Sequence, residues 1–268
     1  RSEGYLEAVP CKGYYACRID GLYQLQPGTE QRERPVSCGE STYDYDFTPN
    51  GIDLDSFPYE AWRRITRNIL LNDRKELFQL GDPKGERELR ETICRYLYQA
   101  RGVNCRAEQI LIGAGNDCLL LLLSAVLGTK RRIAMETPTY RHAYGIFEQL
   151  GFSLCTVPVD GSGMQVQALR ESGADTAYVM PSHQYPLGIV MPIKRRLELL
   201  AWAAEEEGRY LIEDDYDSEF RYKGKPIPAL QGADRQGRVI YMGTFSKAIA
   251  PAIRISYLVL PERLMREC

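Results

Sequence analysis

The chain has 268 residues, with 34 basic and 36 acidic side chains and a formal net charge of −2. Hydrophobic residues make up 44% of it, as in a soluble globular protein with one large domain and an appendage. The small charge excludes a general attraction to nucleic acid, and no apolar stretch is long enough to span a bilayer. Eight dispersed cysteines, two histidines and no export signal predict a cytoplasmic protein without a metal site.

The first residues predict a short pair of strands. Residues 1–17 end a helix at Gly4 and then form two strands around a turn at Pro10–Gly13, the first strand showing the alternation of Tyr5–Val9. Residues 18–42 are rich in Gly, Pro, Gln, Glu, Arg and Ser, which is typical of an exposed linker. Both ends look cut, so we expect a fragment of a longer protein.

From Tyr43 onward, helical and strand patterns alternate. Helices are predicted over 57–71, 85–100, 116–127, 140–150 and 194–206, and strands over 109–112, 132–135, 152–157, 176–180, 210–213, 239–242 and 255–260. Short apolar strands interleaved with helices predict an α/β fold with a mainly parallel, buried sheet and flanking helices.

The segment Tyr241–Lys247 leads from a strand into a turn with two hydroxyls, Thr244 and Ser246, and a lysine, and Arg254 follows. Pyridoxal 5′-phosphate (PLP) needs this combination, because a lysine amine forms an aldimine with its aldehyde and hydroxyls and an arginine hold its phosphate. The alternative is a strand followed by a surface Lys and Arg.

A second strand, Tyr210–Glu213, runs into Asp214-Asp215-Tyr216-Asp217. An aspartate on the pyridine nitrogen makes PLP an electron sink, and a tyrosine two residues on can reach the 3′-oxygen of the ring. A solvated acidic loop and a divalent-metal site remain alternatives. The apolar strand before Asp214 favours the cofactor, because sites in α/β folds form at the carboxyl ends of strands.

Two further strand ends carry cofactor-like residues. Gly113-Ala114-Gly115-Asn116 lies between a strand and an apolar helix, where free N–H groups can bind phosphate, although many such segments are only tight turns. Tyr140 follows Glu136-Thr137-Pro138-Thr139 and can stack on a flat ring, although a tyrosine there can equally be a core or surface residue.

Together these motifs resemble the large domain of the class I and II aminotransferases, PLP enzymes of fold type I. The chain is most similar to the MocR/GabR subfamily of GntR-type transcriptional regulators, in which a linker joins a winged helix-turn-helix to an aminotransferase-like domain. The similarity lies in residues 3–15, 81–90, 181–188, 213–220 and 243–254. It implies a wing remnant of the winged helix over 1–17, a linker over 18–42 and a PLP domain, incomplete at its C-terminus, over 43–268.

The resemblance also implies a role for each matching residue. Lys247 forms the aldimine and is the catalytic residue. The other residues that it assigns to PLP are Asp214 on the pyridine nitrogen, Tyr216 on the 3′-oxygen, Tyr140 on the ring face, and Gly115, Asn116, Thr244, Ser246 and Arg254 on the phosphate.

One departure bears on function. Ordinary aminotransferases carry Asn-Pro-x-Gly where this chain has Tyr185-Pro186-Leu187-Gly188, and the expected fragment lacks both the small domain and the helices that read DNA. We therefore expect a regulator that senses an amino compound by aldimine exchange at Lys247, binds DNA through the winged helix of the full-length protein and forms a homodimer. A PLP-dependent aminotransferase acting on an amino acid and a 2-oxo acid, and a scaffold domain that has lost PLP, are the alternatives.

Overall fold

The computed structural model describes residues 6–16, 55–71, 75–220 and 227–267 in two units, 1–51 and 52–268. The first unit holds an antiparallel hairpin of β1 (Leu6–Val9) and β2 (Gly13–Ala16). Cys11 and Gly13 adopt positive φ in its turn, which Lys12 N–H closes on the Val9 carbonyl. The predicted pair of strands is confirmed, whereas the helix end at Gly4 and the linker over 18–42 lie outside the described residues.

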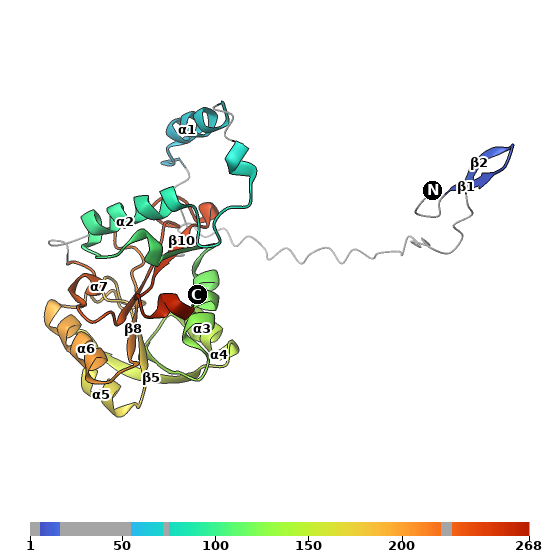
Figure 1. Cartoon of the computed structure of the whole chain (residues 1–268). Coiled ribbons are helices and arrows are strands. Elements are labelled where there is room, and N and C mark those ends of the chain that lie inside the picture. The colour runs from blue at the N-terminus through green and yellow to red at the C-terminus, as the bar shows by residue number, and fades with distance from the viewer. Residues whose placement is uncertain (1–5, 17–54, 72–74, 221–226, 268) are drawn as a thin grey trace, which may run out of the picture. The chain divides into compact units, whose positions relative to one another are not determined.

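The second unit is built on an eight-stranded sheet (Figure 1). Its order is β3 (Ile110–Gly113), β10 (Ser256–Val259), β9 (Val239–Thr244), β8 (Tyr210–Asp214), β7 (Thr176–Val179), β4 (Arg132–Thr137), β5 (Ser153–Asp160) and β6 (Gly163–Met164). The five strands from β9 to β5 are parallel, while β10 runs antiparallel to both of its neighbours and β6 runs antiparallel to β5. The predicted α/β fold with a mainly parallel sheet is confirmed.

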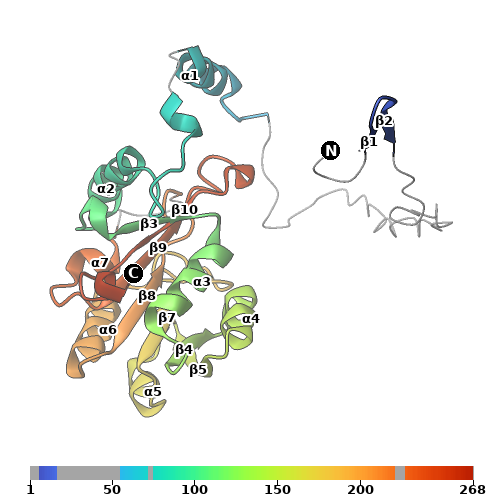
Figure 2. The ribbon, with the colours of Figure 1, turned by 45° about the vertical axis from the view of Figure 1, so that its right-hand side comes forward.

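Helices cover both faces of the sheet (Figure 2). On one face lie α3 (Asn116–Leu127) and α4 (Arg141–Gln149), and on the other α5 (Val166–Glu171), α6 (Ile193–Glu205) and α7 (Leu230–Ala233). The first pair buries Leu119, Leu123 and Phe147 against the sheet, and the second group buries Leu199 and Trp202. A third apolar cluster lies beneath α2 (Arg87–Arg101).

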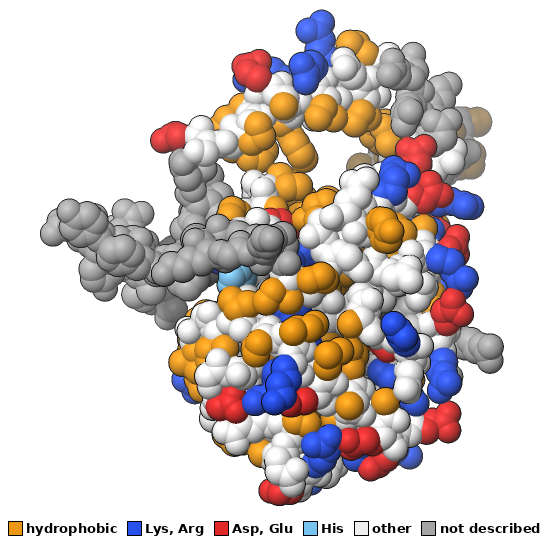
Figure 3. Space-filling model, turned by 90° about the vertical axis from the view of Figure 1, so that its left-hand side faces the viewer, with side chains coloured by type: hydrophobic (Ala, Val, Ile, Leu, Met, Phe, Trp, Pro, Cys, Tyr) orange, Lys and Arg blue, Asp and Glu red, His pale blue; other side chains and the backbone are white. Residues whose placement is uncertain are grey.

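Helix α1 (Tyr59–Leu71) has no buried residue. Its apolar face includes Trp62, Ile65 and Ile69, whose exposed fractions are 48%, 53% and 39%. In Figure 3, hydrophobic side chains line the underside of this helix, at the top of the view, across a hollow from the rest of the unit. An amphipathic helix buries such a stripe in its stable state, so this face is suited to a partner surface.

The short elements were not predicted. Strand β6 has two residues, α7 has four and α5 has six, too few for a helical or strand period to be visible. The direction of β10 was not predicted either, because an apolar run carries no information about strand direction. Among the described helices, none has both the length and the apolar character that crossing a membrane requires.

Candidate functional site

The predicted site residues gather at one edge of the sheet. Asp214 ends β8 and Thr244 ends β9, and the parallel pairing of these strands brings both ends to the same edge. The reversed strand β10 begins there too, with Ser256 opposite both Thr244 and Gly113. Four chain segments that are distant in sequence therefore share one edge, as the strand-end rule predicts.

Asp214 is buried, with 4% of its surface exposed, and it accepts a hydrogen bond from the hydroxyl of the buried Tyr178. Burial raises the pKa of Asp214 to about 6, and the Tyr178 hydroxyl limits the rise. The carboxyl is thus desolvated but ionises near neutral pH. Such a group can bind a protonated ring nitrogen strongly.

Asp215, the next residue, has the opposite electrostatic behaviour. Burial alone would raise its pKa, but the Arg101 guanidinium, with help from Ser182 and Tyr241, holds the pKa below its ordinary value. Arg101 Nε lies 2.7 Å and the Tyr241 hydroxyl 2.5 Å from Oδ2, while Ser182 donates to Oδ1. Asp215 is therefore a buried anion that ties α2 to the end of β8 and to β9.

Glu213 completes the buried acidic run. Its two carboxylate oxygens accept hydrogen bonds from Leu230 N–H at 2.7 Å and Gln231 N–H at 2.8 Å, at the start of α7. Burial, and then the charge of Asp215, raise the pKa of Glu213 above its ordinary value. A solvated acidic loop is thus excluded, and the described residues contain no cluster of three metal-ligating side chains.

Lys247 lies in the turn that follows β9. Its Nζ is 2.5 Å from Oδ2 of Asp217 and 6.0 Å from the centre of the Tyr216 ring. The lysine side chain is 45% exposed and that of Asp217 only 17%. Lys247 is therefore reachable from solvent while its amine is held over the segment that carries Asp214.

The Arg254 guanidinium lies against the turn at Gly115, which was predicted to bind phosphate. Gly115 has φ +94°, and a Cβ there would overlap the Arg254 guanidinium, whose Nη2 donates to the Ala114 carbonyl at 3.2 Å. Helix α3 begins at Asn116 without a side-chain cap, so its first N–H groups are available to an anion. The close approach of guanidinium and helix start fits a phosphate group.

The Ser256 hydroxyl, which was not predicted to belong to the site, lies beside the predicted phosphate-binding residue Thr244. Ser256 Oγ donates to Thr244 Oγ1 at 2.9 Å, and Thr244 Oγ1 donates in turn to Ser246 Oγ at 3.0 Å. Ser256 is fully buried, so it fixes the orientation of the Thr244 hydroxyl. It was missed because its position opposite Thr244 follows from the reversed direction of β10.

Tyr140 precedes α4 and packs its ring edge-on against Tyr185, with 5.7 Å between the ring centres. The side-chain amide of Gln184 donates to the Pro138 carbonyl at 2.8 Å and so joins the two turns that carry these tyrosines. Asp214 is close enough to contribute to a raised pKa of Tyr140, of which burial is the larger cause. Tyr140 thus follows the end of β4, at the same edge of the sheet as Asp214.

Glu136 lies near the end of β4. It is fully buried, and neither carboxylate oxygen accepts a hydrogen bond of good geometry. Burial raises its pKa to about 7, and the nearby Gln184 side chain and the backbone of Met164 and Met180 limit the rise. The burial of Glu136 was not predicted, because a glutamate that follows an apolar run is more often exposed.

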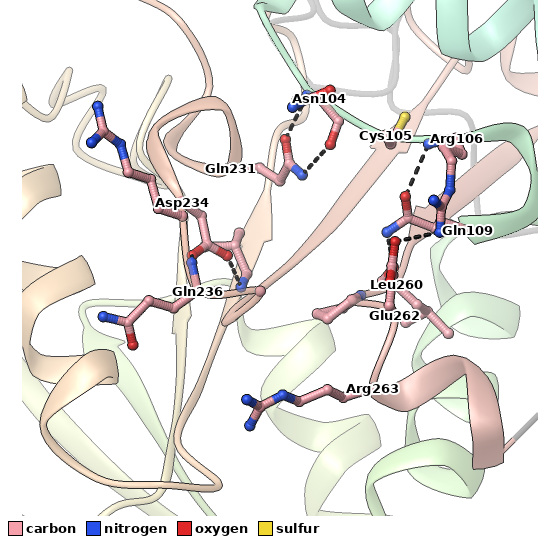
Figure 4. Close-up of a pocket in the computed structure, with 14 residues that line it drawn as sticks. Asn104, Cys105, Arg106, Gln109, Gln231, Asp234, Gln236, Leu260, Glu262 and Arg263 are labelled. Carbon is pink, nitrogen blue, oxygen red and sulfur yellow. Dashed lines mark hydrogen bonds and ion pairs between the residues drawn. The ribbon is translucent and has the colours of Figure 1, made fainter.

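A cavity of about 500 Å³ lies at the opposite edge of the sheet (Figure 4). It is lined by residues that precede β3 and β9 or follow β10, among them Arg106, Gln109, Asp234 and Arg263. None of the predicted cofactor residues lines it. The cavity is therefore separate from the site at the carboxyl edge.

Comparison with known proteins is consistent with this geometry. Residues 46–267 match the family model described as aminotransferase class I and II. The chain is 43% identical to the HTH-type transcriptional regulator YdeL of Bacillus subtilis, over 99% of this chain and 57% of that protein. It is 35% identical to the probable rhizopine catabolism regulatory protein MocR of Rhizobium meliloti, over 81% of this chain and 44% of that protein.

A solved structure shows the same fold. The Pyrococcus horikoshii kynurenine aminotransferase, in complex with PMP, superposes with a TM-score of 0.72 at 32% identity, over 80% of this chain and 55% of that chain. The chain thus spans about half the length of the proteins it matches, between 44% and 57%. These matches confirm the resemblance to the MocR-type regulators. The matched aminotransferase family is PLP-dependent.

Tyr178→Phe tests the environment of Asp214. Loss of the hydroxyl raises the pKa of Asp214 above about 6, so less of the carboxyl is ionised at pH 7. We expect the dissociation constant for PLP to rise about tenfold at pH 7, the effect of one hydrogen bond to a charged group, and the difference to shrink at pH 9. Fluorescence titration measures both values. Tyr144→Phe on α4 is the control, and equal affinities in the two variants would contradict the assignment.

Glu136→Gln tests whether the pKa of the buried Glu136 carboxyl is raised, through the pH dependence of protein stability. Its folded-state pKa lies above the unfolded value, so the unfolded state loses its proton first and stability falls as pH rises between 4.5 and about 7. The difference between these two pKa values corresponds to a loss of at most about 3 kcal/mol in the free energy of unfolding. We expect the variant to be more stable than wild type at pH 8 and similar at pH 4.5, measured by urea unfolding.

The exposed Glu148→Gln on α4 is the matched control for charge removal. A stability difference between Glu136→Gln and wild type that does not change with pH would show that Glu136 ionises normally.

Proposed function

Since the chain belongs to the class I and II aminotransferases, we propose that it holds PLP at the carboxyl edge of its sheet and uses it to detect an amino compound in a transcriptional regulator. The observation that carries the proposal is the convergence of Lys247, Asp214 and the Gly115–Arg254 cradle at that edge. PLP supplies an aldehyde that bonds covalently to amines and a ring that withdraws electrons.

Each part of the cofactor has residues to receive it in this proposal. Lys247 provides the amine, and Asp214 binds the ring nitrogen. The Tyr216 hydroxyl reaches the 3′-oxygen, and Tyr140 lies on the ring face. The residues for the phosphate are Gly115, Asn116, Thr244, Ser246 and Arg254.

Several observations support a regulatory role. YdeL and MocR are named as regulators, and this chain covers about half of each. Tyr185 stands where ordinary aminotransferases carry asparagine, and the hairpin of β1 and β2 is compatible with the wing of a winged helix. We infer that the longer protein binds DNA through that winged helix and that an amino compound, by displacing Lys247 from PLP, alters DNA affinity.

An aminotransferase is the second candidate. The set of cofactor residues is complete, and the Pyrococcus horikoshii kynurenine aminotransferase shares 32% of its residues with this chain over the matched region. Sustained turnover of an amino acid with a 2-oxo acid would favour the enzyme. Displacement of Lys247 by an amine without turnover would favour the sensor.

We also propose that the protein is a homodimer. The apolar face of α1, with Trp62, Ile65 and Ile69 exposed, supports it because a second copy would remove this face from water. Analytical ultracentrifugation of wild type and Ile65→Lys tests this proposal. We expect the variant to sediment as a monomer at concentrations where wild type is a dimer.

Lys247→Ala tests the attachment of the cofactor. Without the amine no covalent bond to PLP can form, so borohydride treatment followed by peptide mass spectrometry should find PLP on Lys247 in wild type and none in the variant. Lys194→Ala, an exposed lysine of α6, is the control and should trap as wild type does. Trapping that persists in Lys247→Ala would show that another lysine holds the cofactor.

The regulatory role is tested with the longer protein that contains this chain. DNA selected from a random-sequence pool by the PLP-loaded protein should bind with an affinity that changes about fivefold or more when an effective amine is added. The Lys247→Ala form should still bind this DNA but lose the response. An absence of DNA binding with and without PLP or amines would exclude the regulator.

A further inference from the structure

Asp217 contacts the amine of Lys247 but is not among the residues proposed to hold PLP. Its Oδ2 lies 2.5 Å from Lys247 Nζ, and its other oxygen, Oδ1, is buried without a hydrogen-bond partner. The side chain is only 17% exposed, although it lies beside a lysine that is 45% exposed. The carboxylate is thus held by the protein and has free acceptor capacity beside the reactive nitrogen.

The backbone fixes this carboxylate in place. Asp217 has φ +57°, a left-handed conformation that aspartate, asparagine and glycine adopt more readily than other residues. Its carbonyl accepts a hydrogen bond from Phe220 N–H at 3.1 Å, closing the turn after β8. The position therefore favours short polar residues, and of these only aspartate carries a charge.

The neighbouring carboxylates are committed to other partners. Asp214 is bound by Tyr178, and Asp215 is bound by Arg101, Ser182 and Tyr241. Glu213 caps the start of α7. Within the described residues, Asp217 is the carboxylate that pairs with Lys247.

We propose that Asp217 transfers the protons when Lys247 bonds to PLP, an inference that rests on the proposed function. The ammonium group of Lys247 gives one proton to Oδ2 of Asp217, and the freed nitrogen attacks the aldehyde carbon. The C–N bond forms as the C=O π bond breaks, and the carbonyl oxygen then takes the proton from Asp217. Asp217 next accepts a second proton from the nitrogen and passes it to the same oxygen, which leaves as water while the C=N bond forms.

Atoms and charge balance in this sequence. An ammonium ion and an aldehyde give a protonated C=N linkage and one water, and Asp217 ends as the carboxylate with which it began. No electrons are gained or lost, so no oxidant or reductant is needed. The same carboxylate serves the reverse reaction, in which Lys247 is released.

A different role predicts a different result. If Asp217 only paired with the Lys247 amine and transferred no proton, its removal would leave the rate of attachment unchanged or raise it. As a proton-transfer group, its removal slows the reaction, because general acid–base groups typically accelerate such steps by about 10²–10⁴-fold.

The test uses Asp217→Asn in the full chain. Asparagine has nearly the same shape and tolerates the left-handed backbone, and the Lys247 partner is 45% exposed and can be hydrated when the charge is removed, so the fold should be retained. We expect stopped-flow absorbance to show PLP attachment slowed at least about tenfold relative to wild type. The final amount trapped on Lys247 by borohydride should be unchanged. A rate equal to or faster than that of wild type would overturn the proposal.

A second variant separates proton transfer from positioning. Asp217→Gly keeps the backbone conformation and opens space for a small acid, so added formate should restore the attachment rate while chloride at equal ionic strength should not. A slow rate that formate leaves unchanged would assign Asp217 a purely structural part. If wild type itself traps no PLP on Lys247, the proposed function fails, whereas normal trapping with an unaffected Asp217→Asn rate overturns this inference alone.

Discussion

The buried ion pair between Arg101 and Asp215 is the constraint on which the site depends. Arg101 comes from the last turn of α2 and Asp215 from the end of β8, and both side chains are almost fully buried, at 3% and 0% exposure. Breaking one partner of such a pair leaves an uncompensated charge in the interior, which is strongly unfavourable. Ser182, Tyr241 and the Ile227 carbonyl share the same pair, so three further segments take their positions from it.

This anchor gives two adjacent acids different roles. Asp215 accepts hydrogen bonds from Arg101, Ser182 and Tyr241 and keeps its charge, whereas Asp214 is bound by the Tyr178 hydroxyl and the Tyr216 N–H. Because alternate residues of a strand point to opposite faces, Asp215 and Asp214 meet different surroundings although they are neighbours in sequence. Of these two residues at one strand end, Asp215 therefore anchors the fold, and Asp214 is the one proposed to bind the cofactor.

Much of this arrangement could be predicted from local patterns. The strands before Asp214 and Lys247, the glycine turn at Gly115 and the helix after it are each visible within a few residues, and the strand-end rule brings them together. Arg101, Ser182 and Ser256 were not predicted, because their partners lie 114, 33 and 12 residues away and their side chains are common surface types. Asp217 stood in the acidic run, but its contact with Lys247 depends on a left-handed backbone that no sequence period reveals.

The buried carboxyls also alter the electrical behaviour of the folded chain. The formal net charge of −2 and the sequence isoelectric point of about 5.9 count every acid at its ordinary strength. In the folded protein Glu136, Glu213 and Asp214 hold their protons to higher pH because they are desolvated. Near pH 6 the native molecule is therefore less negative than its sequence suggests, and it should focus in a native gel at a higher pH than the denatured chain.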